Sequence, residues 1–137
     1  MRSTGVNRKR STAAQSTSLF ANMTFKGGTL QIQPSGPNLG EREAMIISRE
    51  ANAAFREHAS SLRRFVLDLS SVQQMSSFGL GVCIELRNLA ADTAGAPTIA
   101  YGLSSTLMDL FRMMRVDRLY TFASSADELE KALAACE

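Results

Sequence analysis

Two adjacent hydroxyl-bearing residues, Ser76 and Ser77, are the strongest candidates for chemistry in this sequence. They lie between an apolar run at residues 65–69 and a Gly-Leu-Gly-Val segment at residues 79–82. The apolar residues of the second segment follow helical spacing, so the two serines are predicted to stand where a helix begins. A helix N-terminus offers unpaired backbone N–H groups and the positive end of the helix dipole. Because such a position accepts a phosphate at low electrostatic cost, the pair is a candidate phosphorylation switch.

The same residues also fit a purely structural role. Ser76 and Ser77 would then cap the helix, because serine hydroxyls accept hydrogen bonds from the first free N–H groups. Gly79 and Gly81 are poor helix formers, each costing about 1 kcal/mol relative to alanine. Their presence indicates close approach, either to the domain's own sheet or to another protein. The residues alone leave both interpretations open.

Enzyme chemistry has little support in this sequence. The only histidine, His58, has no cysteine or paired carboxylate at ligand spacing, and it is expected at a helix end or on the surface. Ser77, His58 and Asp68 could be imagined as a triad, but no Gly-x-Ser-x-Gly elbow surrounds Ser77. The glycines at 79 and 81 lack the third glycine of a dinucleotide-binding fingerprint. Asp68 is expected to bind its own loop rather than a metal. We therefore predict no catalytic residue, no cofactor and no metal.

Composition divides the chain into two parts. Residues 1–20 contain four basic side chains and no acidic one, so residues 21–137 keep 15 − 4 = 11 basic against 13 acidic side chains, a net of −2. The basicity thus belongs to residues 1–20, which are rich in Ser, Thr and Ala and are predicted to be a disordered basic tail. Residues 21–137 are predicted to form one domain without a nucleic-acid footprint.

The sequence also bears on the location of the protein. No apolar run is long enough for a secretory signal or a membrane span. The two cysteines, Cys83 and Cys136, are too few to suggest a disulfide framework. A cytoplasmic protein without direct membrane insertion is therefore expected.

Alternating strands and helices predict an α/β fold. The Gly27-Gly28 pair predicts a two-residue hairpin turn. Pro34 to Asn38 should break regular structure. The order of elements predicts four to five strands in a mostly parallel sheet, with an antiparallel edge from the hairpin and about four helices. The expected strands cover residues 22–26, 29–33, 65–69, 97–101 and 119–122, and the expected helices cover 41–59 and 78–91 and begin at 104 or 105 and at 125.

Methionines near residue 110 form a second candidate contact surface. Met114 shares an apolar stripe with Leu107 and Leu110 and is predicted to lie in the core. Met108 and Met113 fall off that stripe, so they are candidates for an exposed binding surface.

Taken together, residues 22–137 resemble the STAS family, and specifically its small stand-alone bacterial anti-sigma-factor antagonists. The strongest likeness is residues 65–82, which are similar to the family's apolar strand, short loop and Asp-Ser-Ser/Thr-Gly-Leu-Gly-Val run. Residues 104–116 and the ending at 124–129 add support. In this resemblance Ser77 occupies the position of the family's phosphorylated serine. Ser76 replaces the family's aspartate, and Phe78 replaces its second serine or threonine.

The resemblance implies a non-catalytic regulator of transcription by partner switching. Its partner would be an anti-sigma factor that is also a serine kinase of the histidine-kinase-like ATPase type. A phosphatase as a further partner and a homodimer of this chain are both left open. Ser77 would be the phospho-acceptor and Ser76 a secondary one. The alternative is a non-phosphorylated STAS binding or scaffold module, for example an accessory of a membrane transport complex. The partner-binding surface is predicted to be Ser76, Ser77, Phe78, Gly79, Leu80 and Gly81.

Overall fold

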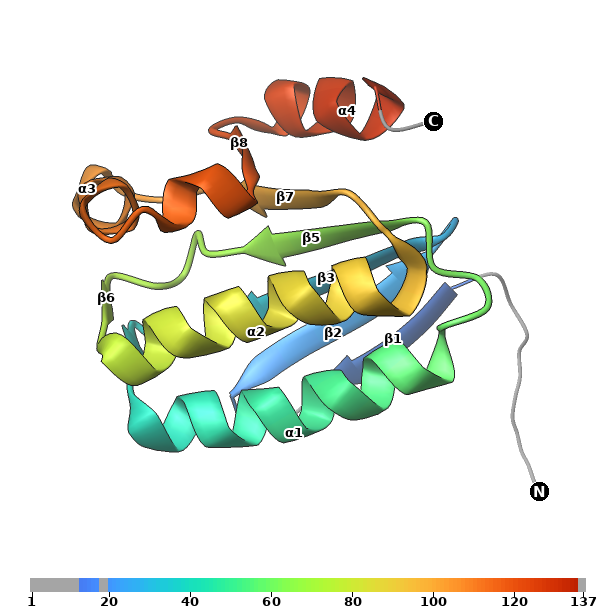
Figure 1. Cartoon of the computed structure of the whole chain (residues 1–137), viewed down its shortest axis with the longest axis horizontal. Coiled ribbons are helices and arrows are strands. Elements are labelled where there is room, and N and C mark those ends of the chain that lie inside the picture. The colour runs from blue at the N-terminus through green and yellow to red at the C-terminus, as the bar shows by residue number, and fades with distance from the viewer. Residues whose placement is uncertain (1–12, 18–19, 136–137) are drawn as a thin grey trace.

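Strands and helices alternate along residues 13–17 and 20–135, the part of the chain that the computed structural model describes (Figure 1). The helices are α1 (Glu41–Glu57), α2 (Ser77–Ala94), α3 (Ser105–Met113) and α4 (Ala126–Ala135), with a short 3-10 helix, η1 (Val116–Leu119). The strands are β1 (Ala13–Thr17), β2 (Ala21–Lys26), β3 (Thr29–Pro34), β4 (Asn38–Leu39), β5 (Arg64–Asp68), β6 (Gln74–Met75), β7 (Thr98–Tyr101) and β8 (Thr121–Ala123).

A six-stranded mixed sheet in the order β1-β2-β3-β5-β7-β8 forms the centre of the molecule. The β1-β2 and β2-β3 pairs are antiparallel, and β3, β5, β7 and β8 run parallel. Gly27 and Gly28 form the β2–β3 turn with φ of 59° and 82°, values that glycine adopts without steric cost. The predicted α/β class, with a mostly parallel sheet and a hairpin at its antiparallel side, is confirmed.

The edge strand β1 corrects the prediction for the tail. Ala13–Thr17 pairs with β2 in register from Ala13↔Lys26 to Thr17↔Asn22, so the expectation of disorder is wrong for these residues. The sheet accordingly has six strands rather than four or five. The physical reason is that the open edge of β2 supplies backbone donors and acceptors to any extended neighbour, whatever its composition. The rest of the predicted tail, apart from Phe20, lies outside the described residues.

A second, two-stranded sheet was not predicted. β4 lies directly after the predicted break and pairs in parallel with β6, with Leu39 opposite Met75. The Pro37 carbonyl accepts hydrogen bonds from the N–H groups of Gln73 (2.8 Å) and Gln74 (2.9 Å). Because β4 leads into α1 and β6 leads into α2, this pairing brings the N-termini of the two helices together.

The helices cover the sheet on both faces (Figure 1). α1 and α2 lie side by side on one face, and α1 buries Ala44, Ile47, Ala51 and Phe55, which recur at helical spacing. α4 packs on the opposite face, where Leu129, Ala132 and Leu133 contact the cluster of Val66, Ile99 and Ala123.

A polar bridge connects α1 with α2. The Glu85 carboxylate of α2 accepts hydrogen bonds from the Ser48 hydroxyl (2.7 Å) and from the Asn52 side-chain amide (3.1 Å), both on α1. The Glu85 carboxylate is partly buried, and these donors keep its charge from being left unpaired. The bridge fixes which turn of α1 lies beside which turn of α2.

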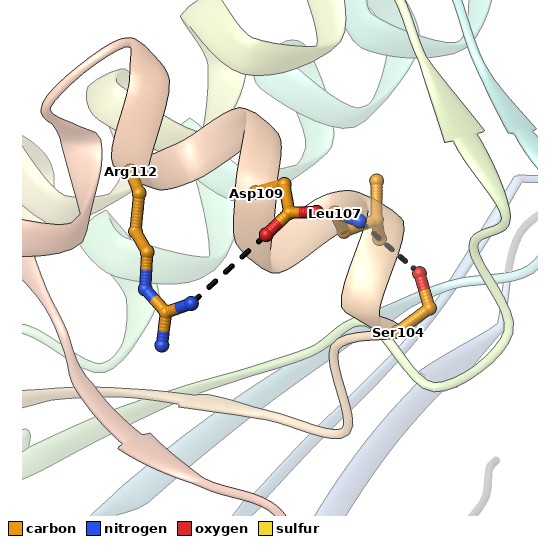
Figure 2. Close-up of polar contacts among 4 residues, drawn as sticks. All are labelled: Ser104, Leu107, Asp109 and Arg112. Carbon is orange, nitrogen blue, oxygen red and sulfur yellow. Dashed lines mark hydrogen bonds and ion pairs between the residues drawn. The ribbon is translucent and has the colours of Figure 1, made fainter.

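Helix α3 begins where the sequence predicted a helix start (Figure 2). Ser104 is its cap, and its hydroxyl accepts a hydrogen bond from the Leu107 N–H at 3.2 Å. The Asp109–Arg112 ion pair on the outer face is 4.0 Å long and exposed, so it contributes little to stability.

The far end of α3 corrects one prediction. Met114 is 54% exposed rather than buried, because the helix ends at Met113 and Arg115 turns the chain with a φ of 61°. Met108 and Met113 were both expected to lie off the apolar stripe. Met113 is 75% exposed, and Met108 is half-buried. The last strand also begins later than expected, since Leu119 belongs to η1.

Cys83 provides a test of the packing under α2. Its thiol is completely buried, and burial raises its pKa to about 12. In a Cys136→Ser variant at pH 8, we expect the folded protein to react with a disulfide reagent at least about a hundredfold more slowly than the urea-unfolded chain, because the thiolate is the nucleophile. Reagent absorbance measures the rate, and equal rates in the two states would contradict this packing.

Candidate functional site

Ser76 is the cap of α2. Its hydroxyl oxygen accepts hydrogen bonds from the N–H groups of Phe78 (3.2 Å) and Gly79 (3.4 Å), and its carbonyl accepts from the Leu80 N–H (3.0 Å). Its own N–H donates to the Leu39 carbonyl of β4 at 3.1 Å. The Ser76 side chain therefore satisfies two of the free donors at this helix end.

Ser77 is the first residue of the helix, and it differs from its neighbour. It is exposed, and its hydroxyl has no hydrogen-bond partner among the described residues. The first turn of α2 contains no acidic side chain. A negative charge placed on the Ser77 oxygen would thus meet the positive end of the helix dipole without a like charge in the same turn.

Phe78 places apolar surface beside this serine. Its ring is 53% exposed, which makes it one of the four large hydrophobic side chains found exposed in the described part of the chain. An aromatic ring on the surface is a frequent contact residue in protein interfaces. Ser77 and Phe78 therefore combine a free hydroxyl with an apolar neighbour.

The other predicted contact residues divide between the inside and the outside. Leu80 is only 6% exposed and lies in the core, so its predicted place on a partner surface is wrong. Gly79 is also buried, and a side chain there would overlap the Leu39 carbonyl oxygen of β4 and lie 3.1 Å from the Met75 Cβ. Gly81 is exposed, and no atom would lie within 4 Å of a Cβ at that position. Close packing within the domain, one of the two alternatives left open for the glycines, therefore explains Gly79 but not Gly81.

The pairing of β4 with β6 creates an open hollow of about 360 Å³ beside the cap. Sequence reasoning missed this feature, because it treated residues 34–38 only as a break. The hollow is lined by Asn38, Leu39, Gly40, Gln74, Met75 and Ser76.

The imagined triad does not form. His58 follows the C-terminal end of α1, about 25 Å along a 17-residue helix from the end beside Ser77, and it stacks on Phe25 with ring centroids 4.0 Å apart. Asp68 binds its own loop, as predicted, because its carboxylate accepts from the Ser70 N–H (2.9 Å) and hydroxyl (2.6 Å).

Among the described residues, no three side chains of His, Cys, Asp or Glu lie close enough together to hold a metal ion. None of their helices combines the length and the apolar character that a membrane crossing requires.

The mixed sheet with α1 and α2 side by side on one face is an arrangement that solved structures share. The chain has the STAS fold.

Three solved structures show the likeness. The anti-sigma factor antagonist SpoIIAA in its unphosphorylated form matches with a TM-score of 0.62 and 13% identity, over 90% of this chain and 97% of that chain. A serine-to-glutamate variant of RsbS from Moorella thermoacetica matches with a TM-score of 0.67 and 18% identity, over 86% and 99%. The murine anion transporter Slc26a9 matches with a TM-score of 0.62 and 18% identity, over 79% of this chain but 18% of the transporter. The sequence matches no protein-family model and no curated protein.

The two glycines of α2 predict opposite responses to the same substitution. Gly79→Ala should lower the free energy of unfolding by about 1–3 kcal/mol, because the new methyl group meets the backbone of β4. Gly81→Ala should raise it by up to about 1 kcal/mol, because alanine favours the helix and the position is open. Urea denaturation measures both variants. A loss of stability in Gly81→Ala would show that the helix end is packed differently.

Proposed function

We propose that this protein is an anti-sigma-factor-antagonist-like regulator of the bacterial cytoplasm, which binds a kinase that is also an anti-sigma factor and is switched by phosphorylation of Ser77. The observation that carries the proposal is the free, exposed Ser77 hydroxyl at the first position of α2 with an exposed aromatic ring beside it. The likeness to SpoIIAA and RsbS in fold supports the same assignment.

The physical effect of phosphorylation has a definite sign. A phosphate on Ser77 adds roughly −1.5 to −2 charges at neutral pH. The helix dipole stabilises this charge, and the Ser76 cap is not disturbed, because its hydrogen bonds involve a different hydroxyl. The fold therefore persists after modification. A partner packed on Phe78 must instead desolvate the new charge, so the unmodified form binds and the phosphorylated form is released.

Ser76 is the less suitable acceptor of the two. A phosphate there would replace the hydroxyl oxygen that caps α2, whereas one on Ser77 replaces no existing contact. This argues for Ser77 as the principal site and leaves Ser76 a secondary one.

The second candidate is a STAS binding module that is not phosphorylated. The likeness to a part of the anion transporter Slc26a9 favours it, because it places the same fold in a membrane transport protein. In such a module the surface around Phe78 would bind its partner constitutively. The two functions differ in whether a modification at Ser77 controls binding.

Intact-mass measurement after incubation with ATP and purified histidine-kinase-like ATPases of the same organism tests the switch. We expect a gain of one phosphate on the wild-type chain, no gain on Ser77→Ala, and retained binding of the unmodified chain to the same ATPase. Ser77→Glu should keep the fold and weaken that binding at least about tenfold, because a fixed charge stands in for the phosphate.

Ser76→Ala is the matched control. It should still be phosphorylated, while its free energy of unfolding falls by about 1 kcal/mol through loss of the cap. Phosphate on Ser77→Ala, or equal ATPase binding by Ser77→Glu and the wild type, would contradict the switch and favour the constitutive module.

A further inference from the structure

Gly81 is a residue that the folded monomer does not explain. It lies inside α2, where glycine is less favourable than alanine, its φ is not in the left-handed region, and the space around it is open. Gly79, two residues earlier, is required by the backbone of β4. A bare position on an exposed helix face permits another backbone or a large side chain to approach closely.

The packing of α1 on α2 places two exposed apolar side chains beside Gly81. The helices start from paired residues, Leu39 and Met75, and Glu85 is bonded to Ser48, so both run in the same direction in register. One turn before this bridge, Met45 on α1 stands level with Gly81 on α2. Phe78 lies three residues before Gly81 on α2, about one turn back. Met45 is 58% exposed and Phe78 is 53% exposed.

A hollow and charges of both signs lie next to these residues. The first turns of α1 carry an open depression of about 380 Å³, lined by Glu41, Arg42, Met45, Ile46 and Arg49. All three charged residues are exposed. The same surface thus contains exposed apolar groups, an open helix position at Gly81, a depression, and charges of both signs. We call this surface, made of Glu41, Arg42, Met45, Arg49, Phe78 and Gly81, the α1–α2 face.

We propose that the α1–α2 face binds a second copy of this chain. A two-fold symmetric contact needs a surface that is complementary to itself. Rotation about such an axis brings Phe78 of one copy towards the open space at Gly81 of the other, and brings Glu41 opposite the arginines. A surface intended for an unrelated acidic or basic partner would not need both signs of charge. The exposed methionines of α3, Met113 and Met114, take no part.

The dimer has a regulatory consequence that rests on the proposed function. It covers Phe78 and Gly81, which the partner of the monomer would contact. Dimer formation therefore competes with partner binding, and the concentration of this protein sets the fraction of chains that are free to bind.

Sedimentation equilibrium of the full chain, with no other protein present, tests the proposal. We expect a reversible dimer between about 5 and 500 μM, since the patch is small compared with a permanent interface. Phe78→Ser and Gly81→Gln should each weaken the dimer at least about tenfold, the first by removing the projecting ring and the second by filling the open space. Gly81→Gln also distinguishes folding from association, because glutamine favours a helix more than glycine and the variant should unfold at a higher temperature.

The double variant Met113→Ser with Met114→Ser is the matched control, since it removes exposed apolar surface from α3, and its dimer should be as strong as that of the wild type. A chain that stays monomeric over the whole range overturns the proposal and leaves the surface to a different protein. A dimer unaffected by Phe78→Ser and Gly81→Gln, or lost in the control, overturns it as well. Because no kinase is used, failure here is distinct from failure of the phosphorylation test.

Discussion

The carbonyl group of Leu39 is the point on which the geometry of the candidate site depends. It accepts the N–H of Ser76 at 3.1 Å, and it stands against the Cα of Gly79 so closely that no side chain fits between them. One backbone group of β4 thus fixes both the cap and the first turn of α2. Since β4 leads into α1 through Gly40, the same pairing determines where α1 begins and which of its turns lies beside α2. Gly79 in this first turn is turned towards β4, whereas Ser77 and Phe78 in the same turn are exposed.

Much of the fold could be predicted from periodicity and turn chemistry. The helix α1, the glycine hairpin, the serine cap of α2 and the start of α3 each have a local cause, and each occurs as expected. The start of α4 has a capping box in altered form. The Ser125 hydroxyl accepts from the Glu128 N–H, but the Glu128 carboxylate binds Ser124, whose N–H and hydroxyl lower its pKa.

The strands that could not be predicted depend on pairing with another strand rather than on their own composition. β4 and β6 have two residues each, too few to show a period, and they exist because each pairs with the other. β1 has a composition typical of a tail and becomes a strand at the open edge of β2. The error at Met114 has a related cause, since a stripe was extended past the residue at which the helix stops.

The position of the serine pair at a helix start could be predicted, but not which side chains of that helix lie outside. Leu80 was expected on a partner surface, yet the domain itself buries most of the apolar residues of α2. α2 contacts α1, β5, β6 and η1, and the Tyr120 hydroxyl from beyond η1 donates to the Cys83 carbonyl at 2.8 Å. Leu80 is therefore a core residue. What remains outside is small: Ser76 and Ser77, the Phe78 ring and the bare backbone at Gly81.

That remainder explains why two serines serve better than one at this position. A cap hydroxyl is held by the N–H groups that it satisfies, so modifying it alters the helix that presents it. A hydroxyl one residue later has the same favourable dipole and no structural duty. In the proposed switch, Ser76 thus stabilises the helix end while Ser77 is the residue that is modified. In the same proposal, a phosphate on Ser77 makes it less favourable for a partner to bury the Phe78 ring, because the neighbouring charge must then lose its water as well.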